Sequence, residues 1–292
     1  MSDAAFEVVQ DLTPALGSEL RVDREALLSG RVAADIRRLL DERLVLSFRA
    51  IGLSPEEQVR FASTLGPIGN QDRGGILQVS QNPDVNPDAE VADYQRASLT
   101  WHFDGFYGGI PDYATMLNAR VLPETGGETH VANAVMAFAD LPADEQEYLE
   151  TLWVVHDVES AMRSVYPWPT HAQLQTWQKS GQRLFPLVWR TKSGRKSLLL
   201  GHSASHVRGM SLPAGRTLLC RLCEWVTQPR YVYTHSWQMG DLLLWDNAGS
   251  LHKASPYPET SRRLMDRTAL LGDNGWEGRS SYFFTAEDDA SV

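Results

Sequence analysis

The segment Leu99–Phe106, LTWHFDGF, places an imidazole and a carboxylate two residues apart, just before a glycine. Alternate side chains of a β-strand project from the same face, so on a strand His102 and Asp104 would point together while Phe103 points away. A nitrogen ligand and an oxygen ligand on one face can share a metal ion. A hydrogen-bonded pair on a solvated face is the commoner explanation of an isolated H-x-D, so the rest of the sequence has to decide.

A second histidine follows the apolar run 241–245, DLLLW, which is typical of a buried strand. The strand stops at an Asp-Asn pair, and His252 comes a short turn later. If this strand and LTWHFD belong to one barrel, His252 can approach His102 and Asp104 across the barrel mouth. Two imidazoles and one carboxylate on one side of an octahedral ion form the facial triad of non-haem Fe(II) oxygenases, which leaves positions open for chemistry.

Two arginines could bind an anion beside such an ion. Arg263 and Arg267 are four residues apart, so on a strand they would face the same way. The planar guanidinium matches a carboxylate with two parallel hydrogen bonds, which lysine cannot do. Apolar neighbours predict a half-buried strand, where an arginine pair needs anionic partners. A solvated basic strand edge is the alternative.

Length and composition limit the classes of protein. The 292 residues contain no internal repeat, low-complexity tract or linker, so we expect one domain over residues 1–292. A net charge of −10 without a cluster of Lys or Arg argues against a nucleic-acid partner. No apolar run is long enough to span a membrane, and the acidic start MSDAAFEVVQD lacks the features of a signal peptide. We therefore expect a cytoplasmic protein that does not bind membranes.

Helices and short strands alternate along the chain. The patterns predict helices over 34–40, 54–66, 142–153 and 215–226, and strands over 44–48, 184–200, 231–237 and 241–245. Ser54 and Pro55 are typical of a helix start. A hairpin turn is expected at 192–195 and an irregular segment at 161–182. The result is a curled β-sheet structure with helices packed outside it.

Other potential ligands have simpler explanations. Cys220 and Cys223 lie three apart on a predicted helix without a second pair, so small apolar core residues are favoured over a zinc or redox site. A separate zinc site at His202 and His206 is a third possibility, although the H-E-x-x-H glutamate is missing. The remaining histidines are expected to lie on the surface or to be hydrogen-bonded in the core: His130, His156, His171 and His235.

In its order and spacing of motifs, the chain resembles the TauD/TfdA family of Fe(II)- and 2-oxoglutarate-dependent dioxygenases. The resemblance covers most of the chain and rests on LVLSFRAIGLSPEEQVRFASTLGPI, WHFDGF, LPETGGETHVANAVMAFADLP, GDLLLWDNAGSLHKA and RRLMDRTALLGD. It implies a mainly β fold with flanking helices, the double-stranded β-helix or jelly roll. The implied reaction uses O2 to decarboxylate 2-oxoglutarate to succinate and CO2, and hydroxylates a C–H bond of a small-molecule substrate.

The resemblance also implies residue roles. His102, Asp104 and His252 would be the iron ligands. Thr129 would contact the distal carboxylate of 2-oxoglutarate, and Arg263 would pair with it. Arg267 would lie on the substrate side of the iron.

Two departures from the family pattern concern the substrate. Gly69 stands where taurine-type members have a substrate-binding histidine, and Gly105 follows the metal aspartate where bulkier residues are common. Together with Phe106 and Tyr107, they predict a roomy pocket with apolar walls for a partly apolar substrate whose anionic group lies near Arg267. Alternatively, a neighbouring residue replaces the histidine and preserves a small sulfonate site: Asn70, Gln71 or Arg73.

Two other functions of jelly-roll proteins fit these residues less well. Radical halogenases replace the metal carboxylate with Ala or Gly, so Asp104 argues against that activity. A non-catalytic binding protein of the cupin type would have no reason to retain Thr129 and Arg263 as a clamp. The expected partner is a small-molecule substrate, and a homo-oligomer is compatible with the sequence.

Overall fold

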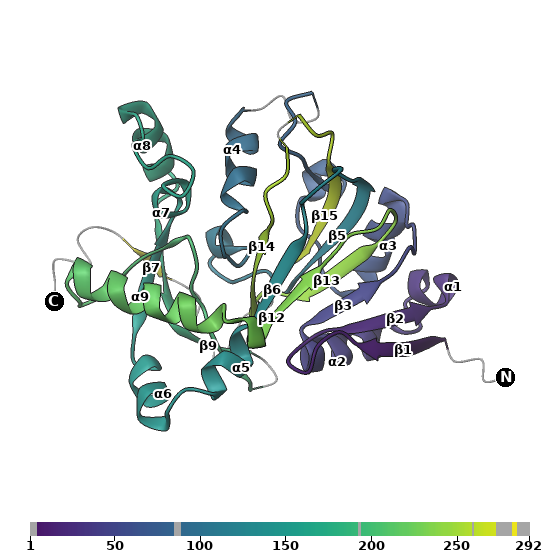
Figure 1. Cartoon of the computed structure of the whole chain (residues 1–292), viewed down its shortest axis with the longest axis horizontal. Coiled ribbons are helices and arrows are strands. Elements are labelled where there is room, and N and C mark those ends of the chain that lie inside the picture. Colours follow the sequence, from purple (N-terminus) through teal and green to yellow (C-terminus); the bar gives the residue numbers. More distant parts are fainter. Residues whose placement is uncertain (1–4, 85–88, 192–193, 259, 273–281, 285–292) are drawn as a thin grey trace.

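A seven-stranded sheet forms the centre of the protein in the computed structural model, which describes residues 5–84, 89–191, 194–258, 260–272 and 282–284. The strand order is β1-β2-β3-β13-β5-β15-β4, and all neighbours are antiparallel except β2 and β3 (Figure 1). The strands are β1 (Phe6–Asp11), β2 (Ser18–Val22), β3 (Val45–Phe48), β4 (Leu77–Val79), β5 (Ala114–Val121), β13 (Leu242–Asp246) and β15 (Leu264–Leu270).

A second, three-stranded sheet stacks on this one. It has the order β12-β6-β14 and consists of β6 (Thr129–Asn133), β12 (Val232–His235) and β14 (Ser250–Ala254). Val131 and Tyr233 of this sheet pack against Leu243, Trp245 and Met265 of the larger one. From β12 to β15 the chain alternates between the two sheets. The predicted jelly roll is confirmed.

Strand β13 explains the uninterrupted apolar run in the sequence. Leu242 and Leu244 pack against the helices α1 (Arg24–Leu28), α2 (Ala33–Arg43) and α3 (Pro55–Leu65), whereas Leu243 and Trp245 face the smaller sheet. Both faces of the strand are therefore covered from Leu242 to Trp245, and all four side chains are apolar.

The segment between β6 and β12 forms a second layer on the side opposite α1–α3 (Figure 1). Its apolar core also contains Phe103 and Phe106, so it supports the loop that carries His102 and Asp104. Strands β11, β7, β8 and β16 form a sheet here, and β9 pairs with β10. The elements of this segment are α5 (Ala134–Ala139), α6 (Ala143–Leu149), β7 (Trp153–Asp157), α7 (Val158–Met162), α8 (His171–Gln178), β8 (Gln182–Pro186), β9 (Val188–Arg190), β10 (Lys196–Leu198), β11 (Ala204–Val207), α9 (Leu212–Val226) and the 3-10 turn Pro229–Tyr231. Strand β16 (Tyr282–Phe284) joins the sheet from a later part of the chain.

Most predicted elements are present, with three corrections. Helix α3 begins after Ser54, as predicted, and the structure adds a capping box between Ser54 and Glu57. The helix predicted over 142–153 ends at Leu149, and 153 already begins β7. The segment 161–182 is not irregular, because α8 begins there with a capping box at Thr170. Cys220 is exposed on α9 and Cys223 half-buried, so the core interpretation is wrong for Cys220.

Two further expectations concern the predicted hairpin turn and membrane-spanning helices. Strands β9 and β10 pair antiparallel, but 192 and 193 of the predicted hairpin turn lie outside the described residues. Across the described part of the chain, no helix combines the length and apolar character needed to cross a membrane.

Candidate functional site

A cavity of about 570 Å³ opens beside the two stacked sheets. His102, Asp104 and His252 line it together with Thr129, Arg263 and Arg267, which are six of the ten residues that the sequence analysis assigned to the site. Gly105, Phe106 and Tyr107 also line it, and only Gly69 of the ten does not.

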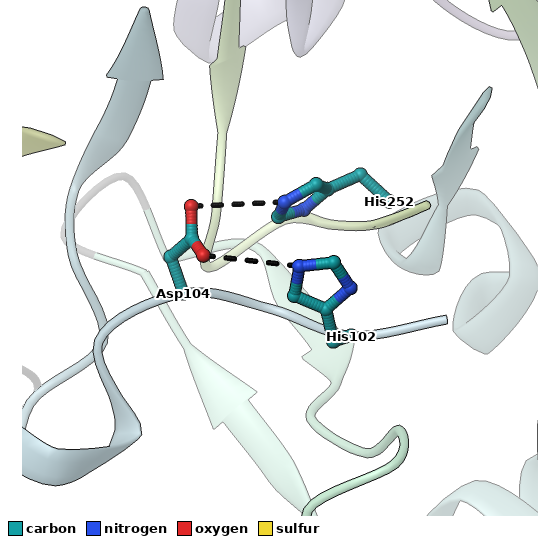
Figure 2. A group of neighbouring side chains, drawn as sticks. All are labelled: His102, Asp104 and His252. Carbon is teal, nitrogen blue, oxygen red and sulfur yellow. Dashed lines mark ion pairs between the residues drawn. The ribbon is translucent and has the colours of Figure 1, made fainter. Parts of the chain in front are cut away.

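The three predicted metal ligands converge from two segments (Figure 2). Their ligand atoms all lie within 4.8 Å of one another. His252 Nε2 is 3.6 Å from Asp104 Oδ2, and His102 Nε2 is 3.9 Å from Asp104 Oδ1. Both histidines are buried. The arrangement suits a small divalent cation.

A backbone bridge, not a strand, places His102. The N–H of His102 donates to the carbonyl of His252 at 3.0 Å, and the reverse bond is 2.8 Å long. His102 Nδ1 lies 2.8 Å from the Thr100 carbonyl, so Nδ1 carries the proton and Nε2 is free to bind a metal. The strand predicted for LTWHFD is therefore reduced to one isolated bridge, although His102 and Asp104 do face the same way.

The charge states of the three side chains also suit a metal. Burial lowers the pKa of His102 and lowers that of His252 well below its usual range, so both imidazoles are neutral. Burial alone would raise the pKa of Asp104, but the Arg267 guanidinium and the hydrogen bond from Thr115 hold it well below its usual range. At neutral pH the site thus presents two neutral imidazoles and one carboxylate, the protonation states that metal binding requires.

Arg263 lies in the wall of the same cavity. It is 2% exposed, donates from Nη2 to the Gly127 carbonyl at 3.2 Å, and stacks 4.9 Å from the Tyr257 ring. Its buried Nε has no hydrogen-bond partner, and no acidic side chain of the described residues pairs with it. Thr129 accepts a hydrogen bond from Trp237 Nε1 at 3.1 Å, which leaves its own hydroxyl able to donate. A buried, unpaired guanidinium favours an anionic ligand.

Arg267, in contrast, has carboxylate partners within the chain. Its Nη2 lies 2.8 Å from Asp104 Oδ2 and 3.3 Å from Asp112 Oδ2. Burial raises the pKa of Asp112 to about 6, against the influence of Arg267. Sequence reasoning missed Asp112, because an aspartate eight residues after the metal aspartate carries no local signal for where its side chain points.

The structure corrects the interpretation of both glycines. A Cβ at Gly69 would meet Leu271 and Ala269, 3.4 and 3.7 Å away, and not the cavity. Gly105 has φ +89°, and a Cβ there would lie 2.3 Å from the Asp112 backbone nitrogen. Glycine at 105 is therefore needed for a tight turn, and neither glycine makes the cavity larger by omitting a side chain.

Aromatic and apolar side chains form the cavity walls. Phe106 and Tyr107 stack with ring centroids 3.9 Å apart, and Tyr107 is partly exposed. Sequence reasoning missed several other wall residues, which come from distant elements: Tyr94 on α4 (Ala89–Ala97), Leu117, Ala161, Trp245 and Tyr257.

The other histidines do not form a second metal site. His202 lines the cavity, stacked 4.9 Å from the His102 ring, and its Nδ1 contacts the Ala97 carbonyl. No cluster of three or more ligating side chains in the described residues includes His202 or His206. Of the rest, His130 is hydrogen-bonded through both nitrogens, His171 is exposed, and His156 and His235 are buried.

Known proteins share both the sequence and the fold. The family model described as "Taurine catabolism dioxygenase TauD, TfdA family" matches residues 9–269. An alpha-ketoglutarate-dependent 2,4-dichlorophenoxyacetate dioxygenase of Cupriavidus pinatubonensis is 34% identical, over 86% of this chain and 92% of the relative. An alpha-ketoglutarate-dependent sulfate ester dioxygenase of Pseudomonas putida is 27% identical, over 84% and 88% of the two chains.

A solved structure agrees with these relatives. The crystal structure of AAD-2 in complex with Mn(II) and N-oxalylglycine superimposes with a TM-score of 0.83 and 27% identity, over 93% of this chain and 98% of that one. The family match extends over most of the chain and includes every predicted ligand. This chain therefore belongs to the TauD/TfdA family and is an Fe(II)- and 2-oxoglutarate-dependent dioxygenase.

Proposed function

We propose that this dioxygenase hydroxylates a small, partly apolar organic anion, and that His102, Asp104 and His252 hold its iron. The observation that carries the proposal is a buried His-Asp-His group in one cavity with an unpaired buried arginine. Bound Fe(II) supplies the coupling of O2 reduction to oxidative decarboxylation of 2-oxoglutarate. The protein's own side chains supply charge, orientation and exclusion of water.

Arg263 and Thr129 bind the distal carboxylate of 2-oxoglutarate in this proposal. The guanidinium fork of Arg263 and the free proton of Thr129 supply donors for the two carboxylate oxygens. The Gly127 carbonyl and the Tyr257 ring fix the guanidinium from behind, so little side-chain freedom is lost when the anion binds. The alternative function, a non-catalytic binding protein of the cupin type, gives no role to Arg263 and Thr129.

The charge of the cavity favours one further anionic group. Lys253, Arg263 and Arg267 line it against Asp104 and Asp112, so the cavity carries one net positive charge in a protein of net charge −10. A divalent metal adds two positive charges and 2-oxoglutarate removes two. The remaining positive charge matches a substrate with a single carboxylate, sulfate or sulfonate.

Arg267 is the proposed anchor for that group. Both of its carboxylate contacts use Nη2, so Nη1 and Nε remain able to donate to a substrate anion. The contact with Asp112 holds the Arg267 guanidinium in place while the substrate anion binds. Phe106 and Tyr107 offer an aromatic surface to the apolar part of the substrate. The relatives named for 2,4-dichlorophenoxyacetate and for sulfate esters support this combination of apolar body and anionic group.

A substrate panel tests the proposal. Taurine, longer alkylsulfonates, alkyl sulfates and aryloxyalkanoates are compared under identical conditions, and succinate formed above the uncoupled background is measured. We expect taurine to be a poor substrate, because its ammonium group would enter a positively charged, apolar-walled cavity. Tight and fully coupled turnover of taurine would contradict the proposal and favour a small sulfonate site.

A further inference from the structure

A chain of three hydrogen bonds connects the cavity wall to Asp104. Trp245 Nε1 donates to Asn247 Oδ1 at 3.2 Å, Asn247 Nδ2 donates to Thr115 Oγ1 at 2.9 Å, and Thr115 Oγ1 donates to Asp104 Oδ2 at 2.7 Å. Trp245 is 2% exposed, and Asn247 and Thr115 are fully buried. The first two bonds are thus shielded from water, and hydrogen bonds are stronger in such surroundings than at the surface.

The direction of every bond is fixed by the first residue. An indole N–H can only donate, so the oxygen of the Asn247 amide must face Trp245. The amide nitrogen then faces Thr115 and can only donate to it. Since a hydroxyl has one proton, Thr115 can give that proton to Asp104 and to no other acceptor. Asp104 Oδ2 therefore receives a directed hydrogen bond.

These residues also join the parts of the fold that carry the ligands. Thr115 lies on β5, where it is paired with Trp245 of β13. Asn247 lies in the turn between β13 and β14, and β14 carries His252. The Trp245 ring also packs 4.7 Å from the His252 ring. Thus one side chain contacts one proposed ligand directly and reaches a second through hydrogen bonds.

We propose that Trp245, Asn247 and Thr115 are positioning residues that set the rotation of the Asp104 carboxylate. Thr115 and Arg267 both bind Oδ2, whereas no described residue donates a hydrogen bond to Oδ1. Oδ1 is therefore the oxygen presented to a metal. Arg267 alone would fix the orientation of the Asp104 carboxylate less well, because its Nη2 also contacts Asp112. In the proposed function, Arg267 binds the substrate as well.

The inference rests on the proposed ligand role of Asp104, and Mn(II) binding tests both. Thr115→Val removes the hydroxyl at nearly constant volume, and Thr115→Ser retains it. Mn(II) affinity is measured by titration of the folded protein, followed by the electron paramagnetic resonance signal of the free ion. Because loss of an outer hydrogen bond to a ligand commonly weakens metal binding by about 10- to 100-fold, we expect a loss of that order in Thr115→Val and less than about twofold in Thr115→Ser.

Asn247→Asp provides a second variant if Thr115→Val does not fold. A carboxylate at 247 cannot donate, so it attracts the Thr115 proton away from Asp104, and Mn(II) affinity should fall as in Thr115→Val. Affinity equal to wild type in the folded variant, or an equal loss in Thr115→Ser, would overturn the inference, since packing would then explain the result. Asp104→Ala distinguishes failure of the positioning inference from failure of the proposed ligand role. Unchanged Mn(II) binding in Asp104→Ala would refute the assignment of Asp104 as a ligand.

Discussion

Replacing Arg263 with lysine tests the proposed 2-oxoglutarate slot. The guanidinium is 2% exposed and held by the Gly127 carbonyl and the Tyr257 ring. Lysine keeps the positive charge but has a single ammonium in place of a planar fork, so one of two parallel hydrogen bonds to the carboxylate is lost.

The size of the effect follows from the strength of that bond. A hydrogen bond to a charged group contributes about 1.5–3 kcal/mol. Since about 1.4 kcal/mol corresponds to a tenfold change in affinity, Arg263→Lys should weaken 2-oxoglutarate binding by about 10- to 150-fold. The neighbouring Arg262 is exposed, so Arg262→Lys is a matched control that should bind as wild type does.

Calorimetric titration of the Mn(II)-loaded protein with 2-oxoglutarate measures this affinity without turnover. The Mn(II) affinity of both variants is checked first, so that a change in metal binding is not mistaken for a change in co-substrate binding. If Arg263→Lys bound 2-oxoglutarate within about twofold of wild type, the slot would lie elsewhere, and Arg267 would be the next candidate.

Three further predictions concern the metal site, acid stability and the turn beside the metal. Asp104→Ala should abolish 2-oxoglutarate-dependent succinate formation, because it removes the only anionic member of the triad; turnover at the wild-type rate would refute the assignment. Burial lowers the pKa of His156 to about 3, below its unfolded value of about 6.5, so its contribution to stability is complete above pH 6.5 and is lost as the pH falls towards 3. Urea unfolding should show a loss of about 1.4 kcal/mol per pH unit from this group, absent in His156→Gln; parallel pH profiles of the two proteins would contradict this. Gly105→Ala should destabilise the fold by about 1–3 kcal/mol, because φ is +89° and the Asp112 nitrogen leaves no room, whereas Gly108→Ala, with no atom within 4 Å of a Cβ, should change stability by under about 0.5 kcal/mol in the same assay.

The sequence predicted those features of the fold and of the site that depend on residues close together in the chain. The run of Leu242–Trp245 predicted a central strand because both of its faces are covered, and Ser54 predicted the start of α3 because the cap is formed within one turn. The spacing of His102 and Asp104 placed their side chains on one face even though the strand itself did not form.

Contacts between distant segments could not be predicted in this way. Asp112 reaches Arg267 only because Gly105 turns the chain back on itself, which depends on φ and on close backbone packing. Gly69 was assigned to the cavity from its place in a motif, but it faces Leu271 at the end of β15. The wall residue Tyr94 comes from a helix that the sequence analysis did not predict.

The interleaving of early and late strands has a consequence for how the protein is made. Strand β13 lies between β3 and β5, and β15 lies between β5 and β4, so a ribosome-bound chain that ends before 240 has two gaps in its main sheet. It also lacks His252 and Arg263. Closing contacts of such long range is slow, and the His102–His252 bridge needs a residue that is made late. We therefore expect the main sheet to close, and the iron site to form, only after residues 242–270 have been made.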